Sequence, residues 1–352
     1  MRRRFKMHRR RGGVRLSAAI CLCLSASLLL FARAGGETTA QSLLERLAGS
    51  TGFVSRAVAL ELGLSDSGSE VFSPRAAASA RSEDATDPVA ESTYIPPTDD
   101  SDTPVLSAAD KAATVTVNNE TSYDVDVAAC LADPAGIRNT GDGPQVLIFH
   151  THGSESYTSD AAFPYTPTET ERTTDIQYNV VRVGDELQKV LEDHGIQTVH
   201  IREIYDSPTY SGSYDRSLAA VEDALAEYPS IGTVIDVHRD SILTDDGRAY
   251  KTSCTIDGEE MAQLMLVVGT DEGGLTHPDW RDNLRNAVGL QYDLNRAYPG
   301  LMRPVNLRTQ RFNQHASPGS LLIEVGSSGN TMPEALAAIR LFGGVLSDQL
   351  NG

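Results

Sequence analysis

Three apolar runs that each carry a polar residue near their end constrain the fold of this chain most. Two of them, in residues 145–157 and 233–241, lead into histidines, and the third, in residues 320–330, carries a glutamate. Short runs of β-branched and large apolar residues are typical of buried strands in a parallel sheet. Open α/β sheets bind their ligands outside the carboxyl ends of the strands. His, His and Glu delivered to one edge therefore predict a metal-assisted hydrolase.

Amphipathic segments alternate with these runs. The pattern predicts strands over 146–149, 197–201, 233–237, 265–269 and 321–325, and helices over 178–195, 217–228, 279–295 and 332–351. Such alternation indicates an α/β fold with a mostly parallel, twisted sheet covered by helices on both faces. We expect a single catalytic domain over residues 113–352.

The first 34 residues are basic and then apolar. Eight Lys and Arg residues lie within residues 1–15, and an apolar run of 17 residues follows over 16–32. This order predicts a signal or a transmembrane anchor over residues 1–34. We expect a cell-membrane protein with one N-terminal anchor and an extracytoplasmic catalytic domain, or a secreted protein if the chain is cleaved after Ala34.

Residues 35–112 are expected to form a short helix and then a disordered linker. The second part, over 65–110, is rich in Ser, Asp, Ala, Thr and Pro. Such a composition buries too little apolar surface to offset the conformational entropy lost on ordering. The linker would connect the membrane to the catalytic domain.

The body of the chain is strongly acidic. Removing the eight N-terminal cations from the 30 Lys and Arg residues leaves 22 basic residues against 48 acidic ones. This balance excludes nucleic acid as a partner. Cys130 and Cys254 have no CxxC spacing, which argues against thiolate chemistry, and the sequence does not show whether they form a disulfide.

The histidines are candidate metal ligands. His150 and His152 are separated by one residue, so in extended backbone their side chains would point the same way. His238 ends its strand between Asp236 and Asp240, and a carboxylate commonly accepts the second ring N–H of a zinc-binding histidine. The alternatives are a solvated loop pair and a neutral histidine that caps a strand.

Glu324 interrupts a run that is otherwise suited to full burial. An unpaired carboxylate there costs several kcal/mol, so it should be paired, metal-bound or protonated. A general acid/base beside a metal would explain it, because burial raises a carboxyl pKa toward neutrality. The alternative is a glutamate at an exposed strand end that pairs with Arg308 or Arg311.

Several polar residues could complete the site. Asp175 lies just before a helix, where it could cap that helix or supply an oxygen ligand. Candidate residues for binding a polar, carboxylate-bearing polymer are Tyr210, Tyr214, Arg239, Arg303 and Asn313. No serine-hydrolase elbow, phosphate-binding loop or HExxH motif occurs in the sequence.

Taken together, these segments resemble the zinc-dependent N-acetylmuramoyl-L-alanine amidases. His-Gly-Ser at 152–154 is similar to the turn that carries the family's first zinc histidine, and His238 is similar to the later one. Glu-Val-Gly at 324–326 is similar to the catalytic glutamate segment. The family's middle ligand is a glutamate shortly before an asparagine, and here Asp175 precedes Asn179 by four residues.

The resemblance to the stage II sporulation protein P family is closer. It runs from about residue 115 to the C-terminus through the segments 118–124, 150–157, 179–187, 210–217, 235–240, 280–284, 299–304 and 324–326. It implies a Zn²⁺ ion held by His152, Asp175 and His238, with His150 and Glu155 as alternative ligands.

The resemblance also implies a function. Glu324 would be the catalytic residue in cleavage of the amide between N-acetylmuramic acid and L-alanine, with possible cross-link endopeptidase activity. The setting would be septal cell-wall remodelling during engulfment in endospore formation. The partners would be peptidoglycan, a lytic transglycosylase and a multispanning membrane protein. The alternatives are a zinc peptidase that acts only on stem peptides and a non-catalytic peptidoglycan-binding scaffold.

Overall fold

The computed structural model describes residues 107–133, 137, 141–168 and 171–352. All described residues belong to one compact unit. The predicted anchor over 1–34 and most of the predicted linker over 35–112 lie outside the described residues. No helix within the described ranges is long and apolar enough to cross a membrane.

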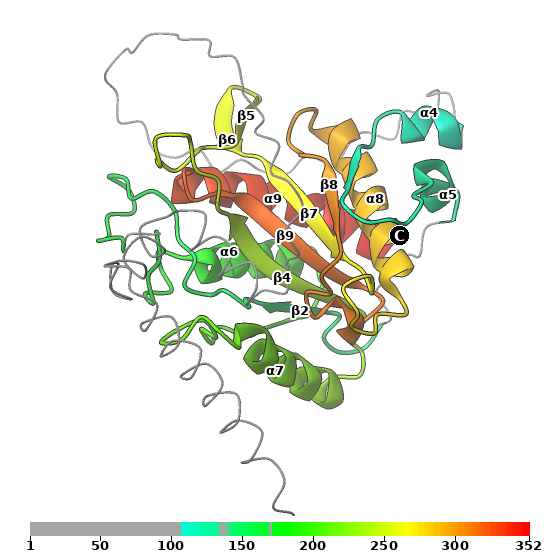
Figure 1. Cartoon of the computed structure of the whole chain (residues 1–352), viewed down its shortest axis with the longest axis horizontal. Helices are drawn as coiled ribbons and strands as arrows, with labels where there is room; N and C mark the ends of the chain where they lie inside the picture. The colour runs from blue at the N-terminus through cyan, green and yellow to red at the C-terminus, as the bar shows by residue number, and fades with distance from the viewer. Residues whose placement is uncertain (1–106, 134–136, 138–140, 169–170) are drawn as a thin grey trace, which may run out of the picture. The chain divides into compact units, whose positions relative to one another are not determined.

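A seven-stranded sheet forms the centre of the described part, in the order β1-β8-β7-β9-β4-β2-β3 (Figure 1). Its strands are β1 (Val117–Asn119), β2 (Val146–Phe149), β3 (Thr198–His200), β4 (Thr233–Asp240), β7 (Leu264–Gly269), β8 (Val305–Arg308) and β9 (Ser320–Ser327). All neighbouring strands are parallel except β7 and β9. The predicted α/β fold with a mostly parallel sheet is confirmed.

The antiparallel β7–β9 pair divides the carboxyl ends of the strands between two edges of the sheet. β9, β4, β2 and β3 end at one edge, which we call the β4 edge. β7, β8 and β1 end at the opposite edge, which we call the β8 edge. The residues that precede β8 therefore reach the β4 edge, and the loops that follow β7 and β8 lie at the β8 edge.

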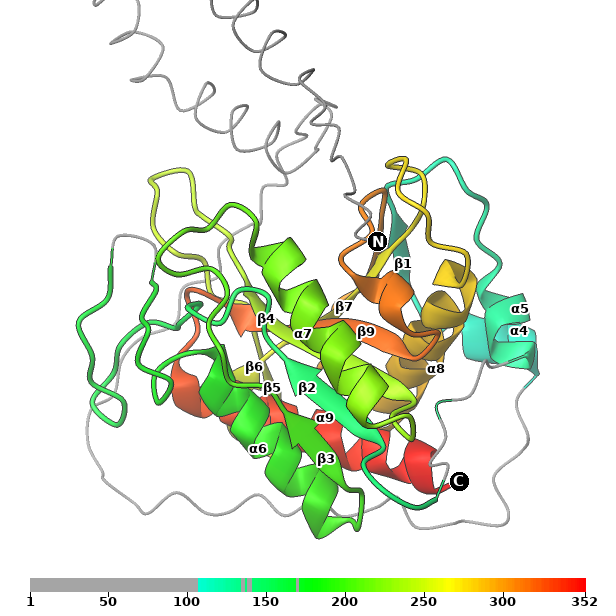
Figure 2. The same ribbon diagram turned by 90° about the horizontal axis from the view of Figure 1, so that it is seen from below.

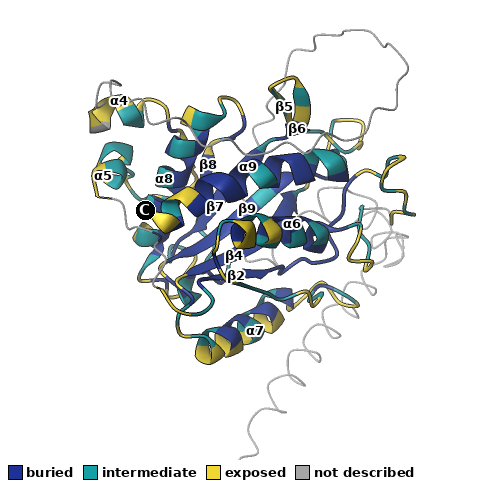
Figure 3. Ribbon diagram, turned by 180° about the vertical axis from the view of Figure 1, so that it is seen from behind, coloured by how far each residue is buried: buried dark blue, intermediate teal, exposed yellow. Residues whose placement is uncertain are grey.

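Helices cover both faces of the sheet, as the sequence predicts (Figure 2). One face packs against α6 (Val180–Asp193), α8 (Trp280–Ala297) and α9 (Met332–Asn351), and the other packs against α7 (Ser213–Glu227). Alternate strand residues supply the two cores: Ile148 and Ile235 lie in the first, and Leu147 and Val234 in the second. Figure 3 shows the strands and most of α9 buried, whereas the outer side of α7 is exposed.

Five shorter elements complete the described part. They are α4 (Ala108–Ala112), α5 (Val127–Ala132), β5 (Ser253–Ile256), β6 (Glu259–Ala262) and the 3₁₀ helix η1 (Gln314–Ala316). Ordered structure thus begins before residue 113, because α4 lies in the last residues of the predicted linker. Cys130 and Cys254 are free thiols.

The α7 face of the sheet is only partly covered, and this positions the site. α7 packs over Leu147, Phe149 and Val234, and Phe312 packs over Met265 and its neighbours. Alternate residues of a strand share a face. On this same face, the residues of β4 and β9 that lie nearer the β4 edge carry polar side chains.

Candidate functional site

His238 lies at the centre of a polar cluster near the β4 edge. Its Nδ1 lies 3.4 Å from Glu155 Oε2, and its Nε2 lies 2.9 Å from Asp236 Oδ1. The second contact is close but is not aligned as a hydrogen bond. Burial lowers the pKa of His238, but the carboxylates of Asp236 and Glu155 outweigh burial and raise that pKa well above its usual value.

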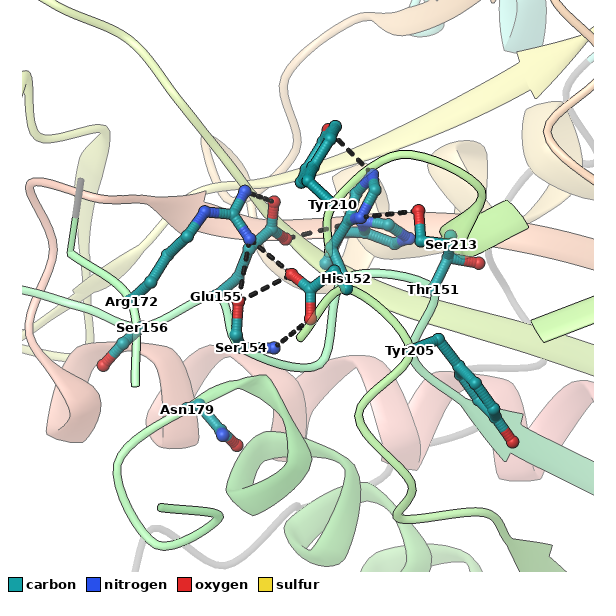
Figure 4. Close-up of polar contacts among 12 residues, drawn as sticks. Thr151, His152, Ser154, Glu155, Ser156, Arg172, Asn179, Tyr205, Tyr210 and Ser213 are labelled. Carbon is teal, nitrogen blue, oxygen red and sulfur yellow. Dashed lines mark hydrogen bonds and ion pairs between the residues drawn. The ribbon is translucent and has the colours of Figure 1, made fainter. Parts of the chain in front are cut away.

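His152 reaches the same cluster from the turn after β2. Its ring lies 5.2 Å from the His238 ring and perpendicular to it. The ring also stacks on Tyr210 at 4.5 Å, and its Nε2 is 3.0 Å from Tyr210 Oη (Figure 4). Burial lowers the pKa of His152 to about 4. The imidazole is therefore neutral at pH 7, the state in which it can bind a metal.

Glu155 supplies an ionised carboxylate to the cluster. Its Oε2 accepts the Arg239 backbone N–H at 3.1 Å and lies against His238. Its Oε1 is 3.3 Å from Arg172 Nη2. Burial alone would raise the pKa of Glu155, but the hydrogen bond to His238 and the charge of Arg239 hold it well below its usual value.

Glu324 stands beside His238 on the neighbouring strand, because the two residues are partners in the β4–β9 register. The residue is partly exposed, but its Oε2 is buried and has no hydrogen-bond partner among the described residues. Burial, aided by the charge of Asp240, raises the pKa of Glu324 to about 8. A carboxyl group that titrates near neutral pH can both accept and return a proton.

Asp236 connects the turn that carries His152 to the strand that carries His238. Its Oδ1 accepts the Thr151 N–H at 2.8 Å, and its Oδ2 accepts the Thr151 hydroxyl at 2.7 Å. The Ser217 hydroxyl of α7 lies 2.9 Å from the Thr151 hydroxyl. One buried carboxylate thus holds the turn that carries His152 and lies against the His238 ring, the position that outer partners of metal-binding histidines commonly occupy.

Arg172 is a residue of the site that the sequence did not predict. Its Nη1 donates to Ser154 Oγ at 3.0 Å and pairs with Asp206. Its guanidinium lies 5.2 Å from the centre of the Tyr210 ring, and Figure 4 shows it next to Glu155. Arg172 comes from an irregular loop, so no periodicity or strand end could have indicated it.

The structure does not bring Asp175 to this cluster. Asp175 is exposed, and its carboxylate accepts the Gln177 N–H at 3.1 Å in a local turn. Asn179, not Asp175, caps α6 by accepting the Val181 N–H. Glu155, one of the predicted alternatives, is the carboxylate that contacts His238 instead.

His150 points away from His152, so the expectation that both side chains share one direction is wrong. The strand ends at Phe149 and a turn follows. His150 Nδ1 lies 3.0 Å from the Val237 carbonyl, and its Nε2 lies 2.8 Å from His200 Nε2 beneath α6. A Cβ atom at Gly184 would lie 2.7 Å from both Nε2 atoms, so only glycine fits there. Both ring nitrogens of His150 are thus occupied by protein partners.

Three of the predicted substrate-binding residues lie around the cluster. Tyr210 is 41% exposed above His152, and the ring of Tyr214 meets the His152 ring edge-on at 5.4 Å. Arg303 Nη1 pairs with Asp240 Oδ2 at 2.8 Å. Arg303 reaches the β4 edge only because β8 runs opposite to β9.

The other two predicted substrate-binding residues are buried and hold backbone. Arg239 Nε donates to the Ser156 carbonyl at 2.9 Å. The Asn313 side-chain amide donates to the Tyr214 carbonyl at 2.7 Å. Arg239 thus holds the turn of Glu155, and Asn313 holds the start of α7.

The donor chemistry of the cluster fits zinc. In the described ranges, no group of three or more His, Cys, Asp or Glu side chains is arranged so that it could hold a metal ion as it stands. His152, His238 and Glu155 are nevertheless the residue types, two histidines and one carboxylate, that many catalytic zinc sites use. The unpartnered Oε2 of Glu324 is a buried polar atom that a water molecule beside such an ion would satisfy.

Comparison with known proteins gives one strong match in sequence. The profile of the family described as stage II sporulation protein P matches residues 67–347. Stage II sporulation protein P of Bacillus subtilis (strain 168) is 31% identical over 224 residues, which cover 60% of this chain and 52% of that protein. The chain therefore spans about half the length of that relative.

Solved structures give a weaker likeness. An N-acetylmuramoyl-L-alanine amidase from Clostridium difficile 630 is 14% identical, with 60% of this chain and 94% of that chain covered and a TM-score of 0.33. The amidase Ami1 from Mycobacterium smegmatis is 13% identical, with 61% and 96% covered and a TM-score of 0.36. Likeness at this level supports no inference about this chain.

Proposed function

The chain belongs to the stage II sporulation protein P family, and we propose that it is a zinc-dependent peptidoglycan hydrolase. Its target would be the amide between N-acetylmuramic acid and L-alanine. The observation that carries this proposal is Glu324, whose buried, unpartnered oxygen lies in the cluster of His152, His238 and Glu155. A proton-transfer group beside candidate metal ligands is an arrangement suited to metal-assisted amide hydrolysis.

Each side chain of the cluster has a separate role in this proposal. Zinc, when held by His152, Glu155 and His238, supplies a Lewis acid that polarises the scissile carbonyl group. Glu324 takes a proton from the attacking water and delivers it to the leaving amine, and its pKa of about 8 suits both steps. Asp236, whose carboxylate lies 2.9 Å from His238 Nε2, would help to orient the His238 ring.

The rim of the cluster would hold the substrate. Tyr210 presents an exposed ring next to His152, on which a sugar or peptide can pack. Arg303 carries a partly exposed guanidinium paired with Asp240, and it can bind a carboxylate of the stem peptide. Tyr214 meets the His152 ring edge-on.

The wider setting of the proposal follows from the family and from the sequence. The enzyme would act in septal cell-wall remodelling during engulfment in endospore formation, with possible cross-link endopeptidase activity. Residues 1–34 would anchor it to the cell membrane with the catalytic domain outside the cytoplasm, or cleavage after Ala34 would release it. Its partners would be a lytic transglycosylase and a multispanning membrane protein.

Digestion of purified peptidoglycan by the full chain tests the proposed activity. We expect zinc-loaded protein to release stem peptides that begin with a free L-alanine amine, as detected by mass spectrometry. A chelator should stop the release and added zinc should restore it. Cuts only within stem peptides would favour the peptidase alternative, and wall binding without cleavage or zinc uptake would favour the scaffold.

A further inference from the structure

Four buried polar atoms without a hydrogen-bond partner gather at the β8 edge. They are four of the ten such atoms in the described part of the chain: His277 Nδ1, Gln310 Oε1, Arg311 Nε and His315 Nδ1. The large majority of buried side-chain polar atoms in folded proteins are hydrogen-bonded. A local concentration of unpartnered atoms therefore calls for a ligand or water molecules.

The four atoms come from two loops that lie side by side. The loop after β7 donates from Thr270 N to the Gln310 carbonyl at 3.2 Å and from Gly273 N to the Thr309 carbonyl at 2.8 Å. The His277 and His315 rings are 6.4 Å apart and nearly perpendicular. Figure 1 shows the two loops, coloured yellow and orange, meeting at the end of the sheet away from the β4 edge.

Arg311 gives this cluster an unbalanced positive charge. Its Nη1 donates to the Thr276 carbonyl at 3.2 Å, and no carboxylate of the described residues pairs with it. Asp271, whose charge reaches His277, accepts a hydrogen bond from Tyr123 Oη instead. Arg311 is partly exposed, but its Nε is buried and has no hydrogen-bond partner among the described residues. In a chain of net charge −18, an arginine that no carboxylate neutralises indicates an anion as the ligand.

The hydrogen-bond network fixes the proton on His277. The Asn283 amide nitrogen lies 2.9–3.0 Å from three carbonyl oxygens, those of Ser317, Pro318 and Ser320, which share its two hydrogens. Its oxygen must therefore accept from His277 Nε2, which lies 2.9 Å away. Burial lowers the pKa of His277, so the ring is neutral and its Nδ1 is an acceptor. The Gln314 backbone is near this ring but is not aligned to bond Nδ1.

The ligand must match both the charge and the acceptors. Arg311 Nε offers a donor, whereas His277 Nδ1 and Gln310 Oε1 need donors from the ligand. A divalent cation would be repelled by Arg311. We propose that the β8 edge binds an oxyanion that keeps a hydroxyl group at neutral pH, of which hydrogenphosphate is the simplest.

Part of this cluster is accessible to solvent. Arg311 and His315 are partly exposed, and Leu275 beside them is 57% exposed, so a small ion can enter from solvent. The proposal is independent of the hydrolase activity, because none of these residues contributes to the cluster at the β4 edge.

Inorganic phosphate and sulfate are the matched probes, because both are tetrahedral oxyanions but sulfate carries no proton at pH 7. We expect the full chain to bind phosphate saturably in calorimetry at constant ionic strength. Binding should be at least about tenfold tighter than for sulfate, because hydrogenphosphate can donate its hydroxyl group to one of the two buried acceptors and sulfate has no donor. The ring resonances of His277 and His315 should move in the same titration.

Substitutions of single residues test whether phosphate binds at this cluster. Arg311→Gln should weaken phosphate binding at least about tenfold. Arg308→Gln is the control, since Arg308 follows the same strand but pairs with Glu120 at 3.1 Å, and it should bind phosphate like the parent. If Arg311→Gln does not fold, Gln310→Ala replaces it as the test variant. Gln310→Ala should weaken phosphate binding but not sulfate binding. The absence of saturable binding, equal affinity for both anions, or an equal loss in Arg308→Gln would overturn the proposal.

Discussion

The two edges of the sheet carry similar pairs of histidines in opposite charge environments. At the β4 edge, His152 and His238 lie among carboxylates, with Glu155 and Asp236 in contact with His238. At the β8 edge, the histidine pair lies beside Arg311, which has no carboxylate partner among the described residues. A pair of histidines therefore does not by itself determine which ligand binds. The charges around the rings decide whether a cation or an anion is favoured.

The pKa values of the histidines follow the same division. Asp236 and Glu155 outweigh burial at His238 and raise its pKa well above the usual value. At His315, burial and the charge of Arg311 act in the same direction and lower the pKa to about 4. A metal at the β4 edge must displace the proton of His238, so metal binding there should release a proton.

Replacing Glu324 should have the largest effect on activity. Glu324→Gln removes the proton-transfer group, and general acid–base catalysis typically contributes about 10²–10⁴-fold to rate. We expect a loss of kcat in that range while zinc binding remains, measured by release of stem peptides and by metal analysis. Glu260→Gln is the matched control, because Glu260 pairs with Lys251 on the β6 hairpin. Full lytic activity in Glu324→Gln would remove the assigned role.

Replacing Glu155 should have the next largest effect, on zinc affinity. Glu155→Gln removes an ionised ligand, and we expect a loss beyond the roughly 10–100-fold that removal of an outer partner of a metal ligand costs. Asp175→Asn should leave the affinity within about twofold, since exposed substitutions away from a site have small effects. Competition with a chromophoric chelator measures both. The opposite result would restore Asp175 as the oxygen ligand.

Asp236→Asn tests whether the His238 ring depends on its buried neighbour. The amide keeps the size of the side chain but removes the charge near His238 Nε2, and zinc affinity should fall about 10–100-fold. Thr151→Val removes only one hydrogen bond to Asp236 and should lower the affinity by less. Equal affinities in parent and Asp236→Asn would show that Asp236 fixes the turn and not the metal ligand.

The sequence predicted the parts of the β4 edge that follow strands. His238 and Glu324 could be found because each interrupts or ends an apolar run, and the parallel alignment of β4 and β9 then places them side by side. His152 was found in the same way. The sheet, its parallel pairs and its four long helices follow from the alternation of apolar periods.

The parts of the site that the sequence did not predict depend on contacts between loops. Loops have no regular spacing of apolar residues that could indicate such contacts. Arg172 reaches Glu155 and Asp206 from an irregular segment, and Glu155 turns toward His238 only because the chain bends after Phe149. β8 is four residues long and was not predicted. Without it, the reversal between β7 and β9, and thus the separate β8 edge, could not be derived from the sequence.

The smallest expected effect concerns stability and compares one arginine from each edge. Arg172 has a side chain that is 24% exposed, and it neutralises Glu155 and Asp206, whose side chains are 8% and 0% exposed. Arg172→Gln leaves these buried carboxylates without a countercharge and should lower the free energy of unfolding by about 2 kcal/mol, less than for a fully buried pair.

Arg311 has no such partner, so Arg311→Gln in phosphate-free buffer should change the free energy of unfolding by less than about 0.5 kcal/mol. Urea denaturation of both variants measures the difference. Adding phosphate should stabilise the parent but not Arg311→Gln, because a ligand that binds only the folded state shifts the unfolding equilibrium. Equal losses in the two variants without phosphate would mean that Arg311 is held by a partner within the protein and that the two edges do not differ in charge balance.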